Sequence, residues 1–136
     1  MIYRALSVVA PAGGWIREGR KTLEVRRWIP EILPLRDLVI VENATRLSTT
    51  GLSRDPEGVA IALVDVSHVS DWTEEQREDA CGSVWEEGWF AWHLTNLRLI
   101  DPPLPAPAER RIYEVDLPDG FHERTGRPGG FSKGTP

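Results

Sequence analysis

The sequence predicts a single α+β domain, a small mixed or antiparallel β-barrel flanked by two or three helices. Three observations predict it: segments that alternate polar and apolar residues recur along the chain, two other segments have helical patterns, and Gly- and Pro-rich turns separate them. Chains that are mostly β with a few helices fold as α+β domains or barrels. A chain of 136 residues buries roughly two thirds of its unfolded surface, enough for one core.

In the first half of the chain, alternation or apolar runs predict strands at Ile2–Val9, Lys21–Trp28 and Asp37–Asn43. A short helix ending at Gly19 or Arg20 separates the first two strands, with Trp15 and Ile16 toward the core. Pro30 and Pro34 predict a loop before the third strand. Residues 44–58 are polar and contain glycine and proline, so we expect a second loop there.

In the second half, the longest apolar-rich strand is expected at Val59–Trp72. A Thr-x-x-Gln capping box, Thr73 to Gln76, predicts a helix over Asp71–Trp85. We expect further strands at Trp89–Ile100 and Arg110–Pro118, with a proline-stiffened connection between them. The domain therefore spans residues 1–118, and residues 119–136, polar and Gly-rich without a period, are expected to form a flexible tail.

Cysteine and histidine content limits the chemistry. The single cysteine, Cys81, excludes an internal disulfide and fits a reducing compartment. We expect it to be an unreactive thiol in the second helix. The three histidines are too scattered to predict a metal site, and nothing in the sequence calls for a cofactor. The N-terminal apolar run is too short to span a membrane and lacks a basic leader, so we expect a cytoplasmic protein without a membrane partner.

Charge is unevenly distributed. The net charge of −5 argues against a protein that coats nucleic acid non-specifically, because such binding depends on neutralising phosphates. Basic residues nevertheless cluster between Arg17 and Arg27, whereas most acidic residues come later. This distribution is compatible with a small or single-stranded polyanionic ligand bound at a local basic site.

The segment Glu18–Trp28, "EGRKTLEVRRW", holds six charged side chains on a predicted strand. It contains the pattern Gly-x-Lys-x-x-Glu-x-Arg without a break, as Gly19, Lys21, Glu24 and Arg26. This pattern, placed after a strand and a short helix, resembles the ASCH domain family, a branch of the PUA-like β-barrels. "LRDLVIVEN" and the aromatic-rich "GWFAWHLTNLRLIDPPLP" are similar to later parts of that family, so the resemblance covers about residues 1–117.

The resemblance implies a PUA-like barrel and a nucleic-acid ligand. Some members are described as nucleic-acid-binding modules, others as single-stranded RNA ribonucleases. Small members resembling N4-acetylcytidine amidohydrolases use a lysine, a threonine three positions later and a later glutamate. Here Lys21 is followed at that position by Glu24, and Thr22 is adjacent to the lysine, which departs from the amidohydrolase pattern.

Alternation along the strand should place Thr22, Glu24, Arg26 and Trp28 on one face. Lys21 belongs to the other face unless the turn before the strand reorients it. Glu24 can hold the Arg26 guanidinium in an orientation suited to bidentate contact with a phosphate or base edge. Lys21 can act as a base or as a point charge for phosphate. The alternative to a ligand site is that Glu24 and Arg26 form a surface ion pair, which would stabilise the fold by less than about 1 kcal/mol.

Six tryptophans in the chain, four of them between Trp72 and Trp92, suggest base stacking. Trp28 and Trp92 are the preferred residues for stacking on a base, because each lies on a predicted strand with polar side chains on the same strand face. Trp15, Trp85 and Trp89 are expected to be structural, and Trp72 to begin the second helix. Asn96 can hydrogen-bond a base edge, and Glu87 can supply a carboxylate acting with Lys21.

Three hypotheses remain open from the sequence. The first is a binding module for single-stranded RNA or a nucleotide or nucleoside, using Arg26, Trp28, Trp92 and Asn96 with Lys21 and Glu24. The second is a hydrolase on the same ligand class, with Lys21, Thr22, Glu24 and Glu87 as catalytic residues. The third is an interaction domain without a ligand. The sequence does not predict the oligomeric state.

Overall fold

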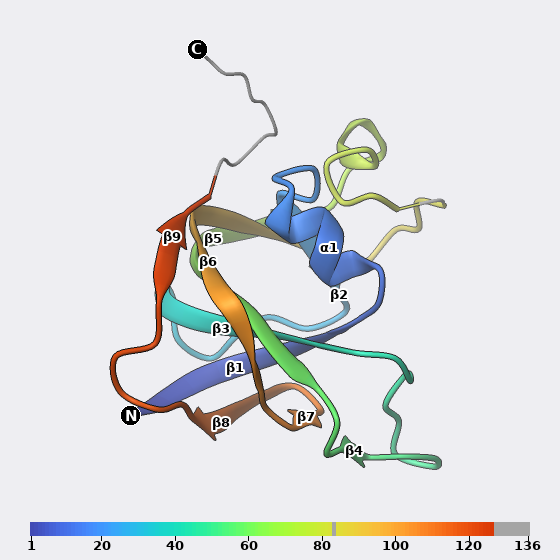
Figure 1. Cartoon of the computed structure of the whole chain (residues 1–136). Helices are drawn as coiled ribbons and strands as arrows, with labels where there is room; N and C mark the ends of the chain where they lie inside the picture. Colours follow the sequence, from blue (N-terminus) through green and yellow to red (C-terminus); the bar gives the residue numbers. More distant parts are fainter. Residues whose placement is uncertain (83, 127–136) are drawn as a thin grey trace.

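The computed structural model describes residues 1–82 and 84–126 and is built mainly of β-strands (Figure 1). The one α-helix among these residues, α1, covers Ala12–Arg17. The strands are β1 (Ile2–Val9), β2 (Leu23–Arg26), β3 (Leu35–Asn43), β4 (Arg54–Asp55), β5 (Val59–Asp71), β6 (Phe90–Pro105), β7 (Ala108–Glu109), β8 (Ile112–Asp116) and β9 (Glu123–Thr125).

The main sheet has the strand order β2-β6-β5-β3-β1-β8, with β9 added along β6. β1 and β3 pair in parallel, whereas the other neighbours pair antiparallel. The sheet bends around the core (Figure 1). However, no ladder in the described part of the chain joins β2 to β8, so the closed barrel expected from the sequence is corrected to an open, curved sheet.

Buried aliphatic side chains form two main clusters, one on each side of the sheet. Alternation along β3 divides them, because Leu38 and Ile40 belong to one cluster and Val39 and Val41 to the other. Helix α1 adds Ile16 to the first cluster. Its Arg17 donates to the carbonyls of Ile61 and Ile100 at 2.6 and 3.1 Å, which fastens the helix to β5 and β6.

The helix predicted over Asp71–Trp85 is wrong. The capping box forms, since Thr73 N–H donates to Gln76 Oε1 at 3.0 Å, but it starts only a 3₁₀ turn, Glu74–Gln76. The segment "TEEQRED" that follows Trp72 has no apolar stripe to bury against the sheet, and short helices gain most of their stability from such packing. The two or three flanking helices are thereby reduced to α1 and this turn.

The structure also describes residues 119–126, the first part of the expected tail. β9 pairs with β6 from Arg98↔Thr125 to Ile100↔Glu123, and the Phe121 ring lies 5.9 Å from that of Tyr3. Residues 127–136 of the expected tail lie outside the described residues. In the part of the chain that the structure describes, there is no helix of the length and apolarity that a bilayer crossing requires.

Candidate functional site

A cleft of about 540 Å³ lies against the charged side chains of the β2 segment; we call it the main cleft. Its walls come from β1, α1, β2, the loop after β3, the Trp72–Trp89 loop and the turn between β7 and β8. This volume is within the range of pockets that hold small organic ligands. Segments far apart in the sequence therefore converge on the turn and strand that carry the Gly-x-Lys-x-x-Glu-x-Arg pattern.

A tight turn places Lys21 in the main cleft. Gly19 has φ of +78°, and the N–H groups of Arg20 and Lys21 both donate to the carbonyl of Trp15, at 2.9 and 3.1 Å. Glycine adopts this left-handed conformation without strain. The turn reorients Lys21 relative to the alternation of β2, and its buried Nζ donates to the carbonyl of Ala80 at 2.6 Å.

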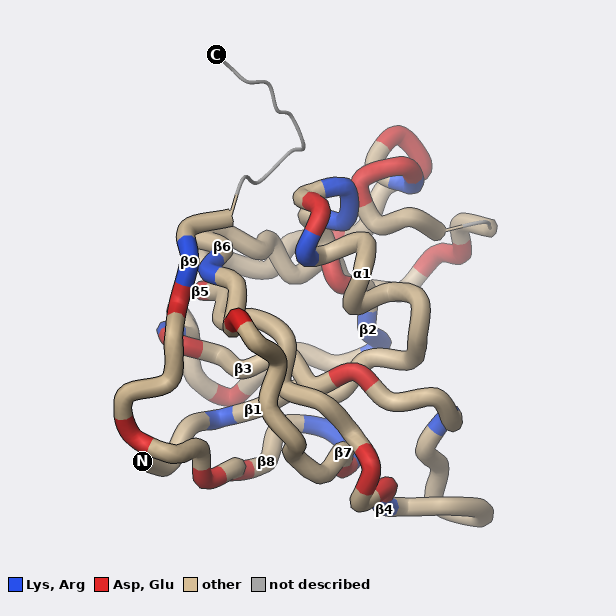
Figure 2. The backbone as a smooth tube through the Cα atoms, viewed as in Figure 1, with Lys and Arg blue, Asp and Glu red and all other residues tan. Residues whose placement is uncertain are grey.

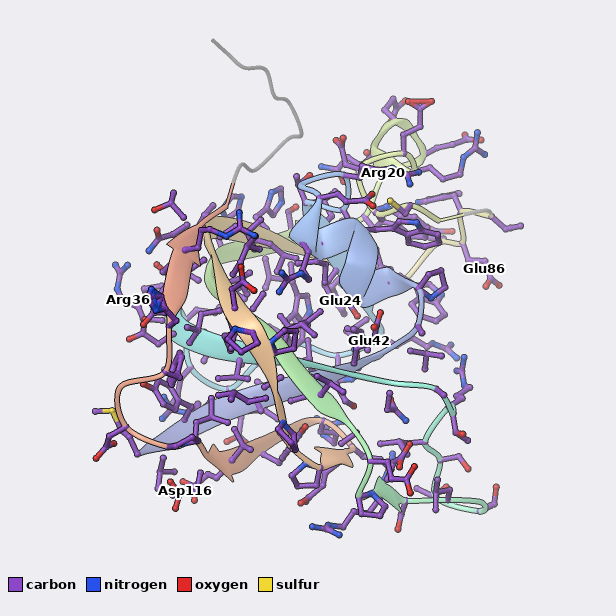
Figure 3. All side chains as sticks on the ribbon, in the orientation of Figure 1. Arg20, Glu24, Arg36, Glu42, Glu86 and Asp116 are labelled. Atoms are coloured by element: carbon purple, nitrogen blue, oxygen red, sulfur yellow. The ribbon has the colours of Figure 1, made fainter. Side chains whose placement is uncertain are left out.

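Glu24 lies between two cations. Its Oε1 is 3.4 Å from Lys21 Nζ, and its Oε2 accepts from Arg26 Nε at 2.7 Å. Burial by itself raises the pKa of the Glu24 carboxyl, but the charges of Arg26 and Lys21 and their hydrogen bonds outweigh burial and lower it. Glu24 is thus ionised at neutral pH, and Figure 3 shows it inside the molecule rather than on its rim.

Ser7 connects the β2 charges to the end of β7. Its carbonyl accepts from Arg26 Nη2 at 2.9 Å, and its hydroxyl donates to the carbonyl of Glu109 at 2.8 Å. Two of the five N–H groups of Arg26 are used by these protein contacts. Arg26 is therefore held in a fixed orientation while retaining donors for a ligand.

The main cleft is strongly cationic. Five basic side chains line it against a single carboxylate, Glu24; the basic residues are Lys21, Arg26, Arg46, Arg110 and Arg111. The last three make no ion pair with any described residue. Figure 2 shows acidic segments elsewhere on the backbone, including the turn after Trp72. A local positive field thus coexists with a net charge of −5.

Sequence reasoning missed Arg46, Arg110 and Arg111. Arg46 lies on the loop after β3, and the other two lie in the turn that enters β8, where Arg111 has φ of +60°. Adjacent arginines at the start of a strand were the only local signal. Arg110 and Arg111 reach the cleft through the pairing of β1 with β8, which joins chain segments about a hundred residues apart. Arg46 reaches it through the pairing of β1 with β3.

The Trp72–Trp89 loop forms one wall of the main cleft. Thr22 and Leu23 N–H groups both donate to the carbonyl of Asp79, at 2.8 and 3.1 Å, and Trp72 N–H donates to the carbonyl of Trp89 at 3.0 Å. Cys81, expected in a helix, lies instead on this loop and lines the cleft. The loop is thereby pinned to the start of β2, beside Lys21.

Three partly exposed tryptophans line the main cleft: Trp15, Trp28 and Trp89. Each has an arginine over its ring, and the closest is Arg111, 4.1 Å from the Trp28 centroid. Trp28 therefore lies where the sequence expected it, beside Arg26. Trp15 and Trp89, which were expected to be structural, also line the cleft; helix α1 carries Trp15, and the loop before β6 carries Trp89.

Trp92 is not available to a ligand. Its side chain is fully buried, its Nε1 donates to the Trp28 carbonyl at 3.2 Å, and its ring lies edge-to-face with Trp28 at 4.8 Å. Trp92 therefore supports Trp28 from behind instead of forming a second stacking surface.

Asn96 lies away from the main cleft, in a β-bulge. Its φ is +52°, and the ladder places Thr95 opposite Asp65 and Arg98 opposite Leu63, so β6 has one extra residue there. Its Nδ2 donates to Asp65 Oδ2 at 3.1 Å. The extra residue reverses the alternation, which is why Leu94 and Leu97 pack in the same cluster.

Thr22 and Glu87 also lie outside the main cleft. Thr22 lines a separate small cavity with Ile16 and Leu94. Glu87 is exposed on the loop before β6 and is not among the lining residues; Figure 3 places the preceding residue, Glu86, on this outlying loop, far from Glu24. Within residues 1–82 and 84–126 there is no group of three or more His, Cys, Asp or Glu that could hold a metal ion.

Fold and site together define a small β-rich domain with a cationic, tryptophan-lined cleft. The chain belongs to the ASCH domain family, whose pattern matches residues 6–104. This confirms the family expected from the Gly-x-Lys-x-x-Glu-x-Arg segment. No curated protein matches the chain.

Proposed function

We propose that the main cleft binds single-stranded RNA or a nucleotide or modified nucleoside. The observation that carries this proposal is the convergence of Lys21, Glu24 and Arg26 in a cleft whose other charged lining residues are all arginines. Membership of the ASCH domain family is consistent with RNA binding by a PUA-like domain. The ligand implied by this chemistry combines phosphate or another anionic group with an aromatic base.

Each side chain has a distinct role in this proposal. Lys21 Nζ uses one N–H for Ala80 and faces Glu24, so the third is available to a phosphate or base carbonyl. Arg26, oriented by Glu24 and Ser7, donates its remaining N–H groups to phosphate or a base edge. Trp28 provides an aromatic face, and Trp15 and Trp89 provide further stacking surfaces in the lining.

A protein of this charge is suited to compact or single-stranded ligands. The negative net charge of the whole protein repels a long polyanion, whereas the five basic residues of the cleft attract a short one. Cytoplasmic location, expected from the lack of a disulfide, remains part of this proposal.

Binding measured by tryptophan fluorescence tests this function. Short single-stranded RNAs and a panel of mononucleotides would be titrated into the parent protein and the Lys21→Ala and Arg26→Ala variants. We expect binding by the parent and a loss of at least about 10-fold in either variant. Arg124→Ala is the matched control, because Arg124 is exposed, pairs with Asp101 and does not line the cleft.

Urea denaturation of every variant would accompany the titrations, since Lys21 is buried and its removal can affect stability. Equal affinity in parent and cleft variants, with all proteins folded at the assay temperature, would contradict the proposal. So would an absence of binding to every ligand by the parent.

A second candidate is a hydrolase of the same ligand class. One observation favours it: a carboxylate oxygen of Glu24 is 3.4 Å from Lys21 Nζ inside the cleft. Thr22 lies in the neighbouring small cavity and Glu87 on the exposed loop, so neither is placed to attack a ligand in the main cleft. Hydrolysis here would use a bound water with Lys21 as its base, once the Lys21 proton has passed to Glu24.

Mass spectrometry separates the two candidates. Parent and Lys21→Ala proteins would be incubated with short RNAs and with acylated nucleosides, including N4-acetylcytidine. A product formed by the parent and lost in the variant identifies a hydrolase and its substrate. Ligand binding without any product from these substrates identifies a binding module.

A further inference from the structure

A second cavity of about 240 Å³ adjoins the main cleft; we call it the side cavity. Trp28 and Arg111 line both, so these two residues form the partition between them. The Arg111 guanidinium lies over the Trp28 ring at 4.1 Å. The boundary is therefore a stacked cation and aromatic ring, a combination that suits a phosphate beside a base.

The side cavity has the chemistry of a nucleotide subsite. Its apolar lining includes Ile29 and Ile32, whose side chains are 47% and 53% exposed and thus accessible to a ligand. Its charged residues are Arg4, Arg111 and one acid, Glu31. Apolar side chains accept the face of a base, and the two arginines outnumber the acid at a position that a phosphate would occupy.

The volumes of the two cavities indicate that the side cavity extends the main cleft and is not an independent binding site. At 240 Å³ the side cavity is below the usual range for a pocket that holds a whole small ligand, whereas the main cleft is within that range. Because the two share Trp28 and Arg111, one ligand can occupy both by passing the partition.

We propose that the protein binds an oligonucleotide of at least two nucleotides, with one base in the main cleft, the next in the side cavity and the linking phosphate at Arg111. This inference rests on the proposed function and goes further by naming a ligand class, an oligonucleotide in preference to a free nucleoside. Arg111 contacts the linking phosphate, and Ile29 and Ile32 contact the second base.

Ligand length is the experimental variable. Isothermal titration would compare three ligands for each of the four bases: the 5′-mononucleotide, the nucleoside 3′,5′-bisphosphate and the 5′-phosphorylated homodinucleotide. The bisphosphate adds the second phosphate without the second base. We expect affinity to rise in this order, with a total gain of about 10-fold or more for the base that binds best.

Two variants test the partition and the side cavity. Arg111→Ala should remove the gain from mononucleotide to bisphosphate. Ile32→Glu, which places a negative charge where the second base lies, should remove the gain from bisphosphate to dinucleotide. Leu52→Glu is the matched control, because Leu52 is 46% exposed and lines neither cavity, and it should keep both gains.

Equal affinity of the mononucleotide and dinucleotide for the parent would overturn this inference, and so would a gain that Ile32→Glu retains. Neither result affects the proposed function, because the mononucleotide still binds in the main cleft. Failure of all three ligands and of longer RNAs to bind would instead overturn both. Urea midpoints for each variant verify that the compared proteins are folded.

Discussion

Glu24 accepts a hydrogen bond from Arg26 Nε at 2.7 Å, two residues along the same strand, and both line the main cleft. The second oxygen of the carboxylate faces Lys21. Since Glu24 is only 7% exposed, water does little to screen these interactions. The carboxylate both orients the cations that a ligand would meet and compensates their charge in the unliganded protein.

Glu24→Gln should destabilise the fold. The substitution leaves two cations close together without a carboxylate, and removal of one partner of a buried pair costs about 3 kcal/mol. Urea denaturation at pH 7 measures the free energy of unfolding. Glu18→Gln is the matched control: its pair with Arg20, at 3.7 Å, is exposed, so the change should be below about 1 kcal/mol. Similar values for the two variants would contradict a stabilising role for Glu24.

The same carboxylate predicts a pH dependence of stability. The folded-state pKa of Glu24 is lowered from the usual 4.5, so its contribution is fully present above that pH and is lost as the pH falls through the folded pKa. Between about pH 5 and pH 3, the parent should therefore lose stability more steeply than Glu24→Gln. Urea midpoints across this range measure the difference. Parallel curves would show that the pKa of Glu24 is unchanged by folding.

Asn96 should matter for stability and not for ligand binding. Asn96→Ala places alanine at φ of +52° and removes the bond to Asp65, which should cost about 1–2 kcal/mol. Asn96→Gly restores the backbone freedom and should cost less. Denaturation and RNA titration of both variants provide the two measurements. Weaker RNA binding by a folded Asn96→Gly protein would contradict this prediction and show that Asn96 contributes to ligand binding.

Salt should weaken binding in proportion to the phosphates contacted. For a single-stranded ligand, each phosphate neutralised contributes about 0.7 to the slope of log affinity against log salt concentration. Arg110→Ala should reduce the slope for a trinucleotide by about this amount, whereas Arg124→Ala should leave it unchanged. Titrations at four salt concentrations measure both slopes. An unaltered slope in Arg110→Ala would show that Arg110 does not contact a phosphate of the ligand.

Local patterns predicted the motif and the six longer strands, but not the short strands β4, β7 and β9. Alternation located most strands, and the spacing of Glu24 and Arg26 placed them on one face before any tertiary contact was known. The capping box at Thr73 also formed as predicted. The helix expected after it did not form, because helix length depends on an apolar face that packs against the sheet, which that segment lacks.

The sequence by itself determined the family, the strand that carries Glu24 and Arg26, and the turn before it that carries Lys21, because side-chain alternation and turn chemistry are properties of neighbouring residues. Only the tertiary structure decided which side chains meet them. Pairing of β1 with β8 brings Arg110 and Arg111 to the cleft. Packing of Trp92 into the core leaves Trp28, and not Trp92, to line the cleft with Trp15 and Trp89. Such contacts join residues distant in the chain, so no local pattern specifies them.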